Sequence, residues 1–486
     1  RPLAERIDPV VLDGSHLSIA ELVALARRGV PVVLAAGVDA RLGAGREVVE
    51  AALAAGEAVY GLTTGVAERK RARLGADREA RSEEALVAAH RIAQGDPVAP
   101  EVVRATIAVL ANGLSRGASG VRPALVGALL GLLGDPDPPA VRPLGSVGQA
   151  DLGPMADLAD GLLARSGIHL EQGEGLALLD NNAFSTAWSA LALADAEVLV
   201  ATMDVAAALD FEAFRANPSV LHPAAVATRP FPGLAATVGR LRDLLGGSEI
   251  WEPGGARNLQ DPLTFRCVPQ VHGAARDALA YATSVVEKEA NSVQGNPVVA
   301  LDERRIVSVG NFDAGEMSAA IDFVRLALAP AVGAAAERTV KLLAGPWSGL
   351  PGGLSAVPGG ADDGLAELAV AAQALAVEAR SLAAPVSHEL VSTSKAEGIE
   401  DRASMAPLSA RRLAEMLGLA ARVVAVELVV AAQGVDLARP ARLGRGTAAA
   451  HAALRRLVPM TTSVASFPSD LEAVVALVGS GGLAEL

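Results

Sequence analysis

Five long stretches of the chain repeat apolar residues with the 3.6-residue period of an α-helix. They are residues 185–209, 274–289, 319–343, 365–382 and 408–433. Several reach or exceed about 20 residues, the usual upper length for a helix of a globular protein. They therefore predict long helices that bury one another in a bundle. Pro330 lies inside the third stretch and should kink or split that helix.

The composition agrees with a helical core. Hydrophobic residues make up 51% of the chain but aromatic residues only 3%, so the core must consist of Ala, Leu and Val, which favours close helix packing. Strand-like segments are short: 32–34, and a possible hairpin of 298–301 with 305–307. Residues 345–364 are rich in Gly, Pro and Ser and predict a long loop. Nothing marks a clean domain boundary, so we expect a single unit over residues 1–486.

The charge and the apolar runs exclude several classes of partner. A net charge of −13 argues against binding to nucleic acid or to an anionic membrane surface. The single cysteine, Cys267, excludes an internal disulfide framework and fits a reducing compartment. The apolar run 413–433 contains Arg422 and Glu427, whereas a membrane span needs about 20 nearly uncharged residues. Residues 1–6 lack the hydrophobic stretch of a secretory signal. We expect a soluble, cytoplasmic protein.

General motif searches find no phosphate-binding loop and no metal site, because His-Glu-x-x-His and Cys-x-x-Cys are absent. A set of ordered blocks is more specific. The set comprises Tyr60-Gly61-Leu62-Thr63-Thr64-Gly65; Leu114-Ser115-Arg116-Gly117 with Ser119-Gly120-Val121-Arg122; Arg142 to Gly148 with Asp151-Leu152 and Pro154-Met155-Ala156; Glu174 to Leu178; Gln260-Asp261-Pro262 with Arg266-Cys267; Asn291-Ser292 with Asn296-Pro297; Gly310-Asn311-Phe312; and Glu400-Asp401 with Ser404-Met405.

These blocks resemble those of the aromatic amino acid and histidine ammonia-lyase and aminomutase family, over roughly residues 8–475. The resemblance implies a mainly α fold, in which a bundle of long central helices carries an N-terminal active-site region. That region would span about residues 1–200, with the bundle and C-terminal helices in 201–486. It also implies a homotetramer in which each pocket takes residues from three chains. Long apolar helices agree with such an assembly, because a lone subunit would expose a large apolar surface.

One departure from the family pattern concerns the cofactor. In the family, an Ala-Ser-Gly tripeptide after Gly-Ser-Val-Gly cyclises and loses water to form a methylidene-imidazolone, an electrophile. Here Gly148 is followed by Gln149 and Ala150, and then directly by Asp151. No serine hydroxyl is available there, and Ser146 precedes the β-branched, stiff Val147. We therefore expect a degenerate loop and no cofactor.

Other pocket positions of the family also differ. Asp180 stands where the family has Asn, Leu263 where it has Tyr, and Asp313 where it has His. Arg402 and Asp157 replace two more His residues, and Ile399 replaces Gln. A buried carboxyl among Asp180, Asp157 and Asp313 would have a raised pKa and act as a general acid or stabilise a cation; a solvated surface carboxylate is the alternative. Leu263 and Ile399 would make the pocket more apolar.

Several groups of the family pattern remain. Tyr60 matches a tyrosine that acts as general base, and Arg266 matches an arginine that binds a carboxylate. Glu400 matches a glutamate that faces the substrate, and His90 occupies a histidine position of the pattern. Each of these residues also has a structural alternative. Tyr60 would be a buried tyrosine with a hydrogen-bonded hydroxyl, and Arg266 would form a structural ion pair. Glu400 would pair with Arg402 or Arg266, and His90 would make a hydrogen bond in the core. Further candidates for substrate contact are Asn291, Asn311, Phe312 and Leu263.

Retained proton-handling groups beside a lost electrophile predict a cofactor-independent enzyme of specialised metabolism. It would cyclise, isomerise or eliminate from an apolar small-molecule intermediate. Tyr60, Glu400, Asp180 and Asp313 would be catalytic. A non-catalytic protein that binds a ligand or partner is the second hypothesis, and a true amino acid ammonia-lyase is the third.

Overall fold

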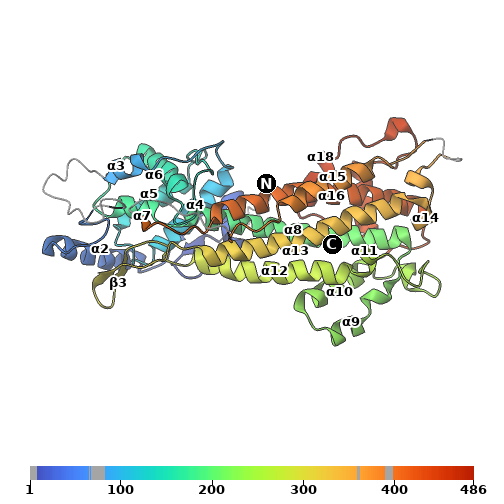
Figure 1. Cartoon of the computed structure of the whole chain (residues 1–486), viewed down its shortest axis with the longest axis horizontal. Coiled ribbons are helices and arrows are strands. Elements are labelled where there is room, and N and C mark those ends of the chain that lie inside the picture. The colour runs from blue at the N-terminus through green and yellow to red at the C-terminus, as the bar shows by residue number, and fades with distance from the viewer. Residues whose placement is uncertain (1–7, 65, 67–82, 358–361, 389–397) are drawn as a thin grey trace. The chain divides into compact units, whose positions relative to one another are not determined.

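The computed structural model describes residues 8–64, 66, 83–357, 362–388 and 398–486, and the chain is mainly helical as predicted (Figure 1). The strands are β1 (Val10–Leu12), β2 (Val32–Leu34), β3 (Val298–Ala300) and β4 (Arg305–Val307). The helices of the first 181 residues are α1 (Ile19–Arg28), α2 (Val38–Ala55), α3 (Glu83–Ala89), α4 (Pro100–Leu114), α5 (Pro123–Leu133), α6 (Leu152–Ser166) and α7 (Glu174–Leu179). The others are α8 (Ala183–Phe214), α9 (Pro223–Thr228), α10 (Pro232–Leu244), α11 (Leu263–Arg266), α12 (Val268–Ala290), α13 (Gly315–Leu343), α14 (Gly345–Ser348), α15 (Leu368–Ser381), α16 (Ala406–Ala438), α17 (Arg445–Leu457) and α18 (Glu472–Gly479).

The five predicted helices correspond to α8, α12, α13, α15 and α16. Four of the five are longer than the periodic pattern predicted, and α15 is shorter. Pro330 does not split α13, which runs without a break from residue 315 to residue 343. By length and composition α13 is long and apolar enough to cross a membrane, but 56% of its most apolar window is buried inside the protein.

The short strands form two separate pairs. β1 and β2 pair in parallel, and β3 and β4 form the predicted antiparallel hairpin with Val298 opposite Val307. The pattern did not predict β1. Of the predicted loop 345–364, α14 forms a short helix, and residues 358–361 lie outside the described part of the chain.

The chain divides into two compact units, each assembled from three separate stretches. The first comprises residues 1–194, 282–321 and 385–411, and the second comprises residues 195–281, 322–384 and 412–486. Four of the five boundaries fall inside α8, α12, α13 and α16, and the fifth follows α15 at residues 384/385. Because the long helices carry the chain across these boundaries, the division has no signal in the local sequence.

In the first unit, α4, α5, α6 and α7 pack in succession, and α2 packs against the β3–β4 hairpin. Val48 and Val49 of α2, Leu62 and Val299 of β3 form a small buried apolar cluster. This cluster brings residue 62, at the end of the Tyr60 block, against a hairpin more than 200 positions away.

The second unit has a core of Ala, Leu and Val side chains that also contains buried charges. Arg338 of α13 lies between Asp210 of α8 and Glu427 of α16, and all three side chains are inaccessible to solvent. Two carboxylates around one guanidinium leave a negative charge, and burial together with Glu427 raises the pKa of Asp210 well above its ordinary value.

Candidate functional site

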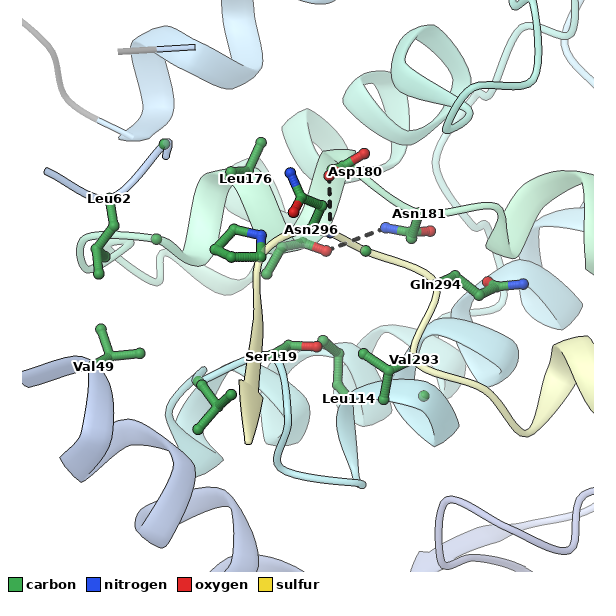
Figure 2. A pocket seen from close by; sticks show the side chains of 18 of the residues that line it. Val49, Leu62, Leu114, Ser119, Leu176, Asp180, Asn181, Val293, Gln294 and Asn296 are labelled. Atoms are coloured by element: carbon green, nitrogen blue, oxygen red, sulfur yellow. Dashed lines mark hydrogen bonds between the residues drawn. The ribbon is translucent and has the colours of Figure 1, made fainter. Parts of the chain in front are cut away.

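A pocket with a cavity volume of about 60 Å³ lies within the first unit (Figure 2). Its apolar wall includes Val49 of α2, Leu114 of α4, Leu176 of α7 and Val293. Its polar side chains are Tyr60, Ser119, Gln172, Asp180, Asn181, Ser292, Gln294 and Asn296. Of the site residues predicted from the sequence, the described lining includes Tyr60 and Asp180.

Asp180 is fixed at the C-terminal end of α7 by the segment that follows α12. The backbone N–H of Asn296 donates to Oδ2 of Asp180 over 3.0 Å (Figure 2). The Asn296 side chain is held in turn, because its Oδ1 accepts from the Val309 N–H over 2.8 Å. A Cβ at Gly295 would lie 2.7 Å from the Asp180 carbonyl oxygen, so this close approach requires glycine.

Burial, assisted by the negative charge of Glu400, raises the pKa of Asp180 from 3.8 to about 7, although the hydrogen bond from the Asn296 N–H opposes the rise. Asp180 is thus divided between its neutral and charged forms near neutral pH. Glu400 itself is exposed and outside the described lining, so it acts on the pocket through its charge.

Tyr60 lies in the turn after α2 and lines the same pocket as Asp180. The turn is held by Thr63, whose hydroxyl accepts from the Val59 N–H over 2.8 Å. At Gly61 φ is +71°, and a Cβ there would lie 2.3 Å from the Leu176 side chain. A glycine is needed after Tyr60 for the turn to approach α7. Gly65, the end of this block, lies outside the described residues.

The loop that differs from the family pattern is held by three segments. The Gly148 carbonyl accepts from the Ser404 hydroxyl over 2.6 Å and from Nδ2 of Asn182 over 3.2 Å. The Ala150 N–H donates to the Phe312 carbonyl over 3.4 Å, and Ala150 has φ of +57°, an uncommon value for a residue with a side chain. The Ser146 hydroxyl accepts from the Gly148 N–H within the same turn.

Asp151, which begins α6, is buried behind this loop. Its Oδ2 accepts from both the N–H and the hydroxyl of Ser185, each over 2.8 Å. Burial raises its pKa to about 6, although these hydrogen bonds oppose the rise. Two amide oxygens nearby, Oε1 of Gln149 and Oδ1 of Asn182, are buried without a hydrogen-bond partner among the described residues. Hydrogen bonds hold the backbone of the loop 148–151, whereas these two side-chain oxygens have no hydrogen-bond partner among the described residues.

Two of the predicted acids are structural ion-pair partners instead. Arg402 donates to both carboxylate oxygens of Asp313. Burial alone would raise the pKa of Asp313, but the hydrogen bonds from Arg402 and the Gly315 N–H hold it below its ordinary value. Asp157 is buried and pairs with Arg142 over 2.9 and 2.7 Å. Each of these carboxylates pairs with an arginine and lies outside the described pocket lining. A general-acid role for either of them stays a prediction.

Most other predicted residues lie outside the described pocket lining. His90 follows α3, and its Nδ1 contacts the Leu86 carbonyl at 2.8 Å. Asn291 joins the N-terminal segment to the end of α12: its Oδ1 accepts from Leu17 and Asn112, and its Nδ2 donates to Leu17 and Glu287. These contacts use every hydrogen-bonding position of the Asn291 amide and support the structural alternative over substrate binding.

Asn311 is exposed and donates to the Val293 carbonyl over 3.1 Å. The backbone carbonyl of Phe312 accepts from the Ala150 N–H in the loop 148–151. Leu263 and Arg266 form the ends of α11 in the second unit, where Leu263 is 64% exposed. Among the described residues, Arg266 has no ion-pair partner. Ile399 is also exposed, so the expected apolar contribution of Leu263 and Ile399 to this pocket is not found.

The sequence did not single out Asn181, Gln294 or Asn296 as pocket residues. Asn296 lies in a matched block and Asn181 close to one, but only the fold shows that α7 meets the segment after α12. Gln294 donates to Glu289 and Thr186 over 3.0 and 2.9 Å. No periodic or spacing signal connects residues more than 100 positions apart.

Comparison with known proteins gives a consistent result. A family model described as aromatic amino acid lyase matches residues 17–168 and 163–456. A histidine ammonia-lyase of Sorangium cellulosum is 37% identical, with 97% of this chain and 98% of that protein covered. A histidine ammonia-lyase of Symbiobacterium thermophilum is 36% identical, with 97% and 96% covered. The crystal structure of histidine ammonia-lyase from Trypanosoma cruzi superposes with a TM-score of 0.88 at 28% identity, covering 98% of this chain and 94% of that chain.

These relatives overturn the function predicted from the sequence. The sequence predicted a cofactor-independent enzyme of specialised metabolism that cyclises, isomerises or eliminates from an apolar intermediate. The second hypothesis was a non-catalytic protein that binds a ligand or partner. Relatives that match nearly the whole chain at 34–37% identity are histidine ammonia-lyases.

Proposed function

Because the chain belongs to the aromatic amino acid lyase family, we propose that it removes the amine of an amino acid by elimination, with L-histidine as the first substrate to test. In this reaction a base takes a proton from Cβ, the Cβ–H electrons form the Cα=Cβ double bond, and the Cα–N bond breaks. The amine leaves with its electron pair and ends as ammonium. The observation that carries the proposal is the 36–37% sequence identity to histidine ammonia-lyases over 97% of this chain.

Within this proposal Tyr60 is the base. It lines the pocket, sits in a turn that Gly61 and Thr63 hold against α7, and belongs to a block that matches the family's tyrosine motif. The mostly apolar wall would exclude water, which helps a phenol to exchange a proton with a carbon acid. Asp180 lines the same pocket as Tyr60.

A finer proposal concerns the loop. We propose that residues 148–151 do not form a methylidene-imidazolone. Gln149 and Ala150 provide no hydroxyl to eliminate. The Gly148 carbonyl and the Ala150 N–H also have partners in other segments, which a cyclised backbone would have to abandon. The elimination would then proceed on an amine that no electrophile holds, and it would depend on how the pocket binds that amine.

The experiment is a turnover assay of the purified protein with a panel of amino acids: L-histidine, L-phenylalanine and L-tyrosine. We expect amine release from L-histidine above the other two. Tyr60→Phe removes the phenolic proton while keeping the ring, and should lower kcat by roughly 100- to 10,000-fold. Asp39→Asn, an exposed change on α2, serves as control. Equal rates for Tyr60→Phe and the control would remove Tyr60 from the mechanism.

A further inference from the structure

The pocket has one acidic side chain and no basic one. Among the described residues that line it, Asp180 carries the only carboxyl group, and the lining holds no Lys, Arg or His. A concave, largely apolar site with one carboxyl group attracts a compact cation and disfavours an anion. Apolar walls strengthen that preference, because they lower the local screening by water.

One oxygen of Asp180 remains available to a ligand. Oδ2 accepts from the Asn296 N–H, whereas no described donor reaches Oδ1. Oδ1 is also absent from the buried unpaired atoms of the described chain, so it keeps some exposed surface while Asp180 lines the pocket. Figure 2 shows this carboxyl beside Asn181 and above the segment that carries Asn296.

The nearest amide does not compete for that role. Asn181 donates from Nδ2 to the carbonyls of Ala177 and Leu178 over 3.2 and 3.0 Å, and its Oδ1 accepts from the Ala183 N–H over 3.1 Å. Asn181 therefore stabilises the end of α7 and has little hydrogen-bonding capacity left. The carboxylate of Asp180 is the stronger and more accessible acceptor.

We propose that Asp180 binds the positively charged group of the substrate, through its free carboxylate oxygen, and so makes this pocket selective for cations. This inference rests on the proposed amine elimination for the identity of the ligand. The cation would be either the α-ammonium of an amino acid or an imidazolium ring; both offer positive charge, and the ring adds an aromatic face to the apolar wall. Asp180 would be a binding residue, and would define a substrate class that an amide at this position would not select.

The test is calorimetric binding of permanent cations that cannot be turned over. Tetramethylammonium probes an aliphatic cation, 1,3-dimethylimidazolium an aromatic one, and tert-butanol a neutral group of similar size. We expect one of the cations to bind more tightly than the alcohol. Preference for tetramethylammonium assigns the site to the ammonium, and preference for dimethylimidazolium assigns it to the ring. Cations that bind no better than the alcohol would overturn the proposal.

Variants of Asp180 make the test specific. Asp180→Asn keeps the shape and an acceptor for the Asn296 N–H but removes the charge, and should weaken cation binding roughly 10- to 100-fold. Asp180→Glu keeps the charge and should retain part of the binding. Asp39→Asn removes a carboxylate from an exposed position of α2 and should bind like the parent chain. Unchanged cation affinity in Asp180→Asn would overturn the proposal, and thermal unfolding of each variant checks that it is folded.

Failure of this inference is distinguishable from failure of the proposed function. If the protein releases amine from L-histidine but its affinity for cations is the same in Asp180→Asn, the cation site is overturned and the proposed lyase activity stands. Cation binding that depends on Asp180, in a protein that releases no amine from any tested amino acid, would keep the site and overturn the lyase.

Discussion

At the scale of single residues, Asp180 also predicts a pH dependence of stability. Its pKa is about 7 in the folded protein against 3.8 as the ordinary value, so the folded chain binds the proton more tightly. The free energy of unfolding therefore contains a contribution that is complete below about pH 4 and is lost as pH rises to about 7. Its size is at most about 4 kcal/mol, from the difference between the two pKa values.

Asp180→Asn should remove this contribution. We expect the unfolding free energy of the parent chain minus that of the variant to fall between about pH 4 and pH 7 and to level off above. Denaturant titrations at several pH values measure it, and the subtraction cancels Asp151, whose pKa is also raised. A difference that rises with pH would mean that Asp180 is ionised and stabilised in the folded protein.

The three aspartates proposed as acids show what residue types can and cannot predict. The sequence proposed Asp180 as a catalytic acid, and the fold places it in the pocket lining. Asp313 and Asp157 have the same residue type and comparable positions in matched blocks, but each of them pairs with an arginine. Arg402 lies 89 positions from Asp313, and Arg142 lies 15 from Asp157. No single-residue rule predicts such contacts.

At the scale of elements, the loop 148–151 makes a prediction about mass. An intact-mass measurement should give the mass of the unmodified chain, because the loop has no serine to dehydrate. A chain lighter by two water molecules would show that a backbone ring forms from other residues and would contradict our proposal for this loop. Digestion to peptides then locates the change to residues 148–151 or elsewhere.

The long helices were predictable and their interruptions were not. The 3.6-residue pattern located α8, α12, α13, α15 and α16 because each buries an apolar face over many turns. Pro330 did not break α13, because packing of a long buried helix outweighs the loss of one hydrogen bond. β1 was missed although the equally short β2, β3 and β4 were predicted, and its pairing with β2 depends on α1 between them.

At the scale of the whole molecule, we expect assembly into a homotetramer. The second unit exposes large apolar side chains on its long helices: Phe323 and Leu326 on α13 are 48% and 47% exposed, and Val370 and Val377 on α15 are 62% and 64% exposed. Apolar side chains clustered on helices favour contact with other copies. Arg266, without an ion-pair partner among the described residues, would bind the substrate carboxylate in such an assembly.

Sedimentation equilibrium tests this expectation. A tetramer should give four times the chain mass of 49.1 kDa, and Arg266→Ala should raise KM for the amino acid while leaving the assembled mass unchanged. A monomer at micromolar concentration with full activity would contradict both the assembly and the role of Arg266 in it.

The central claim is that this chain eliminates an amine from an amino acid. The most direct measurement is the simultaneous quantification of ammonium and of the unsaturated acid formed when the purified protein is incubated with L-histidine. We predict that both appear in equal amounts, and that their formation rate falls in Tyr60→Phe. Recovery of unchanged L-histidine, with neither product formed by a folded protein, would contradict the claim.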